Sequence, residues 1–368
     1  MRGRGRGGHN RARGTRGSGN NRAAPRTSTR NWERAPAGAV PAASGSKTSS
    51  GGSRGIKDDD RAGLQWLPSV SRSSGLEPNG DALRSFETQQ EYWEFITEKI
   101  MSLEIPGRYI PKSVSERQEK ESNAMILLRK LREGFVATHR QDGFAIQVVE
   151  KSTYLSIIYN SPVNIASSFA YLSDAYAVKP ETAKISNLNK TAIELLQFLQ
   201  SLVDEFPSQR ISHRFILGSN EQCLPRSSTE WSFASDIAMA LRRSNWWALE
   251  KLTNPKVIDE RLKNEPWSGP TSGSGESCSE TESIFLGLPS RALAHLLDRL
   301  RTKVRSSAWP VLRSAYREVA KAPWLEQSLL LPGEGIGEFM RNAVEKSEAV
   351  AKDAVTDAWI LRRPVVRV

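Results

Sequence analysis

The strongest constraint on the fold lies in residues 228–330, whose second half carries a long amphipathic pattern. One set of apolar residues recurs at helical spacing through Leu293, Leu296, Leu297, Leu300 and Val304. A second set continues the spacing through Ala308, Val311, Leu312, Ala315, Tyr316 and Val319. Because Ser307 can cap a helix and a proline is tolerated in a first turn, as Pro310 would be, we expect two helices that meet at Ser307. Apolar stripes need neighbouring apolar surfaces, so this stretch predicts a scaffold.

The first half of the same stretch predicts two shorter helices. Ser227 and Glu230 have capping-box spacing, and the apolar stripe that follows runs through Phe233, Ile237, Ala240 and Leu241. Asn245 interrupts the stripe, and a new helix is expected over residues 246–252. We interpret Trp246, Trp247 and Tyr316 as core or interface residues. For the two tryptophans, stacking on nucleic-acid bases is the alternative.

Residues 81–265 predict a series of helices joined by short polar turns. A helix is expected over 115–133, ending at Gly134, and others over 164–177 and after an Asn189 cap. Residues 142–159 also fit a helix, although their β-branched residues leave a strand open. No fixed-length repeat is readable, so the fold class is mostly α, an irregular stacked-helix array.

The C-terminal part has mixed signals. Residues 266–283 are rich in glycine, serine and acidic residues, which predicts a flexible surface insert. The sequence 333–338, GEGIGE, is interpreted as a hinge, and an alanine-rich helix is expected over 338–357. Short strands are expected around Pro364.

The N-terminal residues 1–80 differ sharply from the rest. Residues 1–57 hold eleven arginines and two lysines against one glutamate, so they carry +12, whereas the whole chain carries +11. Their few apolar residues cannot offset the entropy of ordering, which predicts a disordered tail. Arginines alternating with glycine resemble RGG-type boxes and favour RNA as a partner; a solubilising or nuclear-targeting tail is the alternative. The expected RNA-binding residues are Arg2, Arg4, Arg6, Arg11, Arg13, Arg16, Arg22, Arg26 and Arg30.

The chain offers little that points to catalysis. Its four histidines do not fall at ligand spacing, and its two cysteines are far apart in polar sequence. We therefore expect no enzyme, no metal, no cofactor and no small-molecule substrate. No apolar run is long enough to span a membrane, and no secretory signal is expected.

Four cations mark a candidate basic face on the predicted helices of residues 288–320. They are Lys303, Arg305, Arg313 and Arg317. An ordinary solvated helix face is an equally good interpretation of this pattern.

The order of these parts resembles the PCI architecture, and within it the GANP-type family of nuclear mRNA-export and mRNA-processing scaffolds. The matching positions are Asn245 with its two tryptophans, Arg305, and the Ala-Tyr-Arg of residues 315–317; the family's Val-Tyr-Glu is matched by Val149-Glu150 without the tyrosine. The resemblance implies a helical array over 81–265 and a winged-helix-like end over 284–368.

The resemblance also implies a function. The chain would be a non-catalytic nuclear scaffold, with shuttling to the cytoplasm left open, whose body binds protein subunits of a PCI-containing complex while its tail binds RNA. Two alternatives remain: an RNA-associated translation or ribonucleoprotein adaptor, and a subunit of the proteasome-lid or signalosome type.

Overall fold

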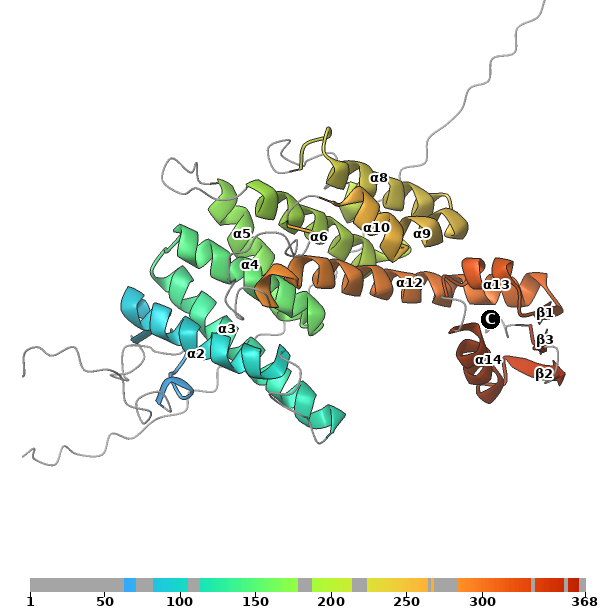
Figure 1. The fold of residues 1–368 in the computed structure, drawn as a ribbon, viewed down its shortest axis with the longest axis horizontal. Helices are drawn as coiled ribbons and strands as arrows, with labels where there is room; N and C mark the ends of the chain where they lie inside the picture. Colours follow the sequence, from blue (N-terminus) through green and yellow to red (C-terminus); the bar gives the residue numbers. More distant parts are fainter. Residues whose placement is uncertain are drawn as a thin grey trace, which may run out of the picture. The chain divides into compact units, whose positions relative to one another are not determined.

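A computed structural model describes residues 63–70, 82–104, 113–177, 187–213, 224–263, 266–267, 284–331, 335–353 and 357–363. The expectations for residues 1–62, and for nearly all of the insert 266–283, lie outside the described residues. The described part is mostly helical and ends in one small sheet (Figure 1). None of its helices combines the length and apolar character that crossing a membrane requires.

The elements follow one another along the chain in this order: η2 (Ala82–Arg84), α2 (Phe86–Glu104), α3 (Val114–Ala137), α4 (Gly143–Ile158), α5 (Pro162–Ala177), α6 (Asn187–Glu205), α8 (Thr229–Arg242), α9 (Trp246–Leu252), α10 (Pro255–Arg261), α12 (Leu288–Ala315), β1 (Glu318–Ala320), α13 (Pro323–Ser328), α14 (Gly335–Glu345), β2 (Ala349–Asp353) and β3 (Ala358–Leu361).

The first hydrophobic core belongs to the helical body, which we define as the described residues from 82 to 304. α4 packs against α3, α5 and α12, and α12 also packs against α6. Because α4 is apolar on nearly all sides, it is buried along most of its length, and Asp142 caps it by accepting a hydrogen bond from the Ala145 amide at 2.9 Å. Residues 142–159 thus form a helix and not a strand.

Gly134 does not end its helix. α3 continues to Ala137, and a Cβ atom at Gly134 would lie 2.8 Å from the Leu83 carbonyl oxygen. The glycine therefore lets η2 approach the helix backbone, an approach that any side chain would block. Gln89 strengthens this contact, since its Nε2 donates to the same Leu83 carbonyl at 2.8 Å.

The two helices expected to meet at Ser307 are a single helix, α12, which runs from the helical body into the C-terminal part (Figure 1). Pro310 lies inside it and leaves the Ser306 carbonyl without its helical donor. Ser306 is exposed, so water can satisfy that carbonyl and the helix tolerates the proline. The second stripe is only partly confirmed: Ala308 and Val319 are buried, but Val311 and Tyr316 are exposed. Trp309 and Arg313 are buried instead.

The second hydrophobic core belongs to the C-terminal module, which we define as the described residues from 309 to 363. Its sheet has the order β1-β3-β2 and is antiparallel, with Val319 opposite Trp359 and Val350 opposite Ile360. The helix expected over 338–357 ends at Glu345, and β2 follows. Ser347 has a φ of 58°, a turn conformation that reverses the chain between the two elements. β3 matches an expected strand, and Pro364 lies outside the described residues.

The two cores meet within α12, between Val304 and Trp309. From the sequence, the C-terminal part was expected to begin at residue 284, just after the polar insert. In the structure, the first four turns of α12 complete the helical body, because Leu293, Leu296 and Leu300 fill the space beside α4 and α6.

Candidate interaction site where the two cores meet

The turn after α13 joins the helical body to the C-terminal module. Leu329 and Leu330 are adjacent and both fully buried, yet Leu329 belongs to the second core and Leu330 to the first. Leu330 has a φ of 52°, the left-handed conformation that turns its side chain away from that of its neighbour. This turn therefore inserts one leucine into each core.

Arg305 of α12 holds the same turn through its guanidinium group. Its Nε donates to the Leu329 carbonyl at 2.9 Å, and a terminal nitrogen donates to the Leu330 carbonyl at 3.2 Å. These carbonyls follow the C-terminal end of α13, where cations interact favourably with unpaired backbone oxygens. Burial lowers the pKa of Arg305, with a smaller opposing contribution from Asp298.

Glu348 latches the C-terminal module to the end of α12. Its Oε1 pairs with Arg313 at 2.8 Å, and its Oε2 accepts from the Trp309 indole nitrogen at 2.8 Å. The Arg313 Nε also donates to the Arg362 carbonyl at 2.8 Å. One carboxylate therefore connects two turns of α12 to the chain just before β2, and the bonds compensate the burial of Arg313.

We call the region of Arg305, the Leu329–Leu330 turn, Arg313 and Glu348 the joint. The predicted aromatic residues lie on or beside the elements that form it. Trp246 is partly buried against the first core, while Trp247 is 55% exposed and donates from its indole nitrogen to the Ser328 hydroxyl at 3.0 Å. Tyr316, also largely exposed, packs against Trp324 with ring centroids 5.1 Å apart. Trp247 and Tyr316 thus reach α13 from α9 and from the end of α12.

The four predicted cations do not form one basic face. Lys303 donates to the Val203 carbonyl, and Arg305 and Arg313 make the contacts described above. Only Arg317 among them is exposed. The structure therefore differs from both interpretations of the pattern, since Lys303, Arg305 and Arg313 are partly or fully buried and donate to backbone carbonyls of other segments.

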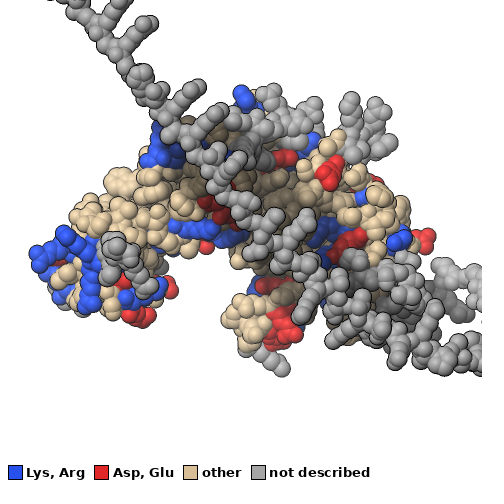
Figure 2. Space-filling model, turned by 180° about the vertical axis from the view of Figure 1, so that it is seen from behind, with Lys and Arg blue, Asp and Glu red and all other residues tan. Residues whose placement is uncertain are grey.

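Exposed basic residues occur elsewhere on the C-terminal module. Figure 2 shows lysine and arginine side chains gathered on this module at the left of the view, with acidic side chains beside them. The exposed basic residues of the module are Arg317, Lys321, Arg341, Lys346, Lys352, Arg362 and Arg363.

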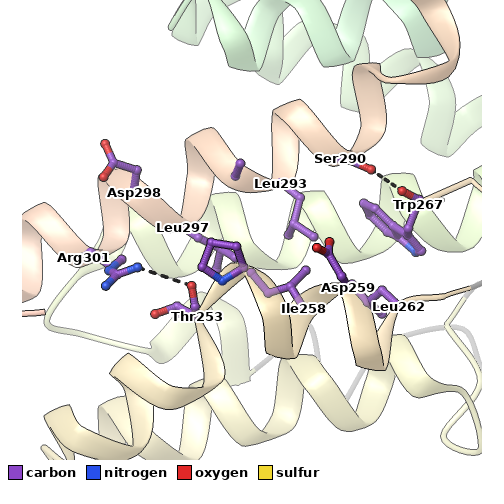
Figure 3. A pocket seen from close by; sticks show the side chains of 12 residues that line it. Thr253, Ile258, Asp259, Leu262, Trp267, Ser290, Leu293, Leu297, Asp298 and Arg301 are labelled. Atoms are coloured by element: carbon purple, nitrogen blue, oxygen red, sulfur yellow. Dashed lines mark hydrogen bonds between the residues drawn. The ribbon is translucent and has the colours of Figure 1, made fainter. Parts of the chain in front are cut away.

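A pocket of about 170 Å³ lies between α10 and α12. Figure 3 shows Leu293 and Leu297 of α12 facing Ile258 of α10, with Asp298 turned away from them. Two polar side chains at its ends are engaged in bonds: Arg301 donates to the Thr253 carbonyl at 3.3 Å and Ser290 to the Trp267 carbonyl. The pocket therefore suits a small apolar group, and the two bonds join α12 to the residue that ends α9 and to Trp267.

Glu150 is a buried carboxylate that the sequence pattern did not single out as a site. It accepts from the Tyr176 hydroxyl at 2.7 Å and from the Asn189 amide at 3.1 Å, so it joins α4 to α5 and α6. Burial raises its pKa to about 6, although both hydrogen bonds favour the ionised form. No sequence signal marks this environment, because its two partners come from other helices.

The histidines are not brought together. His139 lies in the turn after α3, His213 follows α6 and His295 is exposed on α12, while His9 lies outside the described residues. Within the described ranges, no group of three or more histidine, cysteine, aspartate or glutamate side chains is placed to hold a metal ion.

Comparisons with known proteins give no relative. No protein-family model matches the chain, and neither the curated proteins nor the solved structures contain a significant match.

Proposed function

We propose that this chain is a non-catalytic, PCI-type scaffold of a nuclear complex in mRNA processing or export. Its helical body and C-terminal module would bind partner subunits, and its arginine–glycine tail would bind RNA. The observation that carries the proposal is the element order of the C-terminal part.

That order is helix, strand, helix, helix, strand, strand, with the first strand beside the last. A winged helix is expected to have this order of elements, which supports the proposal, and here the order follows directly from a set of packed helices through the shared α12. Partial matches at Asn245, Arg305 and residues 315–317 point the same way.

The joint supports a scaffold role. Arg305, Glu348 and the Leu329–Leu330 turn tie the module to α12 at several points, so the two parts can present a fixed surface to a partner. The outer sheet face adds apolar surface, because Val350 and Ile360 pair across the strands and are each 39% exposed. We propose this face as the partner-binding surface.

The RNA part of the proposal rests on charge. The first 57 residues carry +12 and the rest carry −1. Deleting them should therefore remove most salt-sensitive RNA binding. Unchanged affinity and salt dependence after the deletion would contradict this part of the proposal.

The protein part can be tested by affinity purification of the full chain from nuclear extract, followed by mass spectrometry. The test variant is Val350→Glu with Ile360→Glu, and the matched control is Val163→Glu on α5, where Val163 is 70% exposed. We expect a defined set of PCI-type or mRNA-export subunits that the double variant loses and the control keeps.

The same experiment separates the two alternatives. Recovery of proteasome-lid or signalosome subunits would assign the chain to that class. Recovery of ribosomal or ribonucleoprotein components alone, lost after ribonuclease treatment, would favour a translation or ribonucleoprotein adaptor and contradict the scaffold role.

A further inference from the structure

Two adjoining hollows lie where the chain after α6 meets the corner between α8 and α9. One, of about 390 Å³, is lined by Gln209, Arg210, His213 and Arg242. The other, of about 320 Å³, shares Gln209 and Arg242 and adds Phe206 and Trp246 among its lining residues. We call the two together the basic–aromatic groove.

The basic half of the groove has polar side chains that no described residue engages. The side chains of Arg210, His213 and Arg242 make no hydrogen bond or ion pair with any residue in the described ranges. Arg242 and Arg210 are exposed. This contrasts with Lys303, Arg305 and Arg313, each of which donates to a backbone carbonyl.

Carboxylates do not neutralise this half. Among the described residues that line the two hollows, none is acidic. The two nearest acidic residues in sequence are engaged elsewhere: Asp204 accepts from Gln200 at 2.7 Å, and Glu205 accepts from the Ile211 amide at 2.7 Å. The groove thus offers at least two positive charges to an anion.

The other half supplies aromatic surface. Phe206 and Trp246 are both partly buried and pack against the first core, so their rings are held in place. A fixed aromatic ring beside arginines that no described residue engages is a combination that can hold a base and its phosphates in a single-stranded nucleic acid. An acidic peptide would use the arginines but has no need of the rings.

We propose that the basic–aromatic groove binds one or two nucleotides of single-stranded RNA, with phosphates at Arg210 and Arg242 and a base against Trp246. This site is separate from the tail. The choice of RNA over DNA rests on the proposed function, whereas the groove's preference for a single-stranded nucleic acid rests on its own residues.

The test uses the full chain and a fluorescein-labelled 15-nucleotide oligouridylate that carries 4-thiouridine. Affinity is measured by anisotropy over a series of salt concentrations, and cross-linked peptides are mapped by mass spectrometry. The groove variant is Arg210→Ala with Arg242→Ala, and the matched control is Lys256→Ala with Lys263→Ala, two exposed lysines in and beside α10. Thermal unfolding checks that both double variants fold.

We expect cross-links at Trp246 or Phe206 in the unchanged chain and in the control, and their loss in the groove variant. The slope of log affinity against log salt should flatten by about 1.4 in the groove variant, since each phosphate contact with a single strand contributes about 0.7. Cross-links confined to residues 1–57, with an unchanged slope in the groove variant, would overturn the proposal. Binding of a phosphoserine peptide but not the oligonucleotide in the groove would also overturn it.

A third variant separates the groove from the tail. Replacing the nine tail arginines from Arg2 to Arg30 named above by glutamine should lower affinity but leave the cross-links at Trp246. Full affinity in this variant would contradict the tail's proposed role while leaving the groove's intact. Loss of the Trp246 cross-links in it would show that the groove does not bind RNA by itself, which contradicts the groove proposal.

Discussion

The helical body buries long aliphatic stripes from α4, α6 and α12 against one another. The C-terminal module instead buries ten of its described residues, which come from the end of α12, from five short elements and from the turn after α13. The body's helices are positioned mainly by apolar contact. The module adds a polar latch, in which Glu348 contacts Arg313 and Trp309. A small core buries too little apolar area to fix short elements alone, so specific polar bonds do part of that task.

Removing a buried apolar side chain from the helical body should cause the largest loss of stability. Leu296 of α12 is fully buried in the first core, so Leu296→Ala should lower the free energy of unfolding by about 2–5 kcal/mol. Val311→Ala, on the same helix but 62% exposed, should change it by less than about 0.5 kcal/mol. Urea unfolding measures both. Equal losses would mean that the second stripe is buried after all.

Removing the latch should affect the module alone. Glu348→Ala leaves the buried Arg313 guanidinium without its carboxylate, which should cost about 2–3 kcal/mol. Hydrogen exchange should show lost protection in β2, β3 and α14 while α4 and α6 keep theirs. Glu345→Ala, at an exposed position on α14, is the control. Equal loss of protection in α4 would show that the two cores unfold as one.

Glu150 provides a pH-dependent test within the body. Its folded pKa of about 6 exceeds the ordinary 4.5, so its stabilising contribution is complete below pH 4.5 and is lost as the pH rises through 6. The difference corresponds to about 2 kcal/mol. Glu150→Gln cannot titrate, and it should therefore gain about that much stability over the unchanged chain between pH 4 and pH 8.

Measuring the free energy of unfolding across this range, for both chains, isolates the contribution of Glu150. Glu119→Gln on the exposed side of α3 should run parallel to the unchanged chain. A stability difference for Glu150→Gln that does not vary with pH would show that the pKa of Glu150 is the same in the folded and unfolded chain, which contradicts the raised pKa.

Removing the hydrogen bond between Trp247 and Ser328 should cause the smallest loss of stability. Trp247→Phe keeps an aromatic ring but removes the indole donor, which should cost about 0.5–1 kcal/mol. A double-mutant cycle with Ser328→Ala measures the coupling between α9 and α13. A coupling energy of zero would mean that this exposed bond does not contribute to the joint.

Several helices could be read from the sequence because their signals are local. Asn245 was expected to interrupt a stripe and start a new helix, and it caps α9 by accepting from the Ala248 amide at 3.0 Å. The cap of α8 was expected at Ser227 and lies at Ser228, one residue later. Such signals act within a single turn, so they do not depend on distant contacts.

Three predicted helix boundaries are wrong because they were inferred from local signals alone. Ser307 and Gly134 carry the local signals of a helix start and a helix end, yet α12 and α3 run through them. Asn189 was expected as a cap and instead lies inside α6, where its side chain bonds to Glu150. At Gly134 and Asn189, a contact with a distant segment outweighs a local preference of less than a few kcal/mol. At Ser307, α12 continues because water can satisfy the exposed Ser306 carbonyl.

The candidate sites also combine features that the sequence determines with features that only the fold determines. The sequence by itself determined that the positive charge is concentrated in residues 1–57 and that Trp246 and Trp247 follow a helix break, because charge and local breaks are properties of the chain. Only the tertiary structure decided that Arg305 and Arg313 serve the joint, while Arg210 and Arg242 line a groove without a side-chain partner among the described residues. A cation's role depends on which acceptors the fold brings within about 3 Å, and those acceptors come from segments far away in the chain.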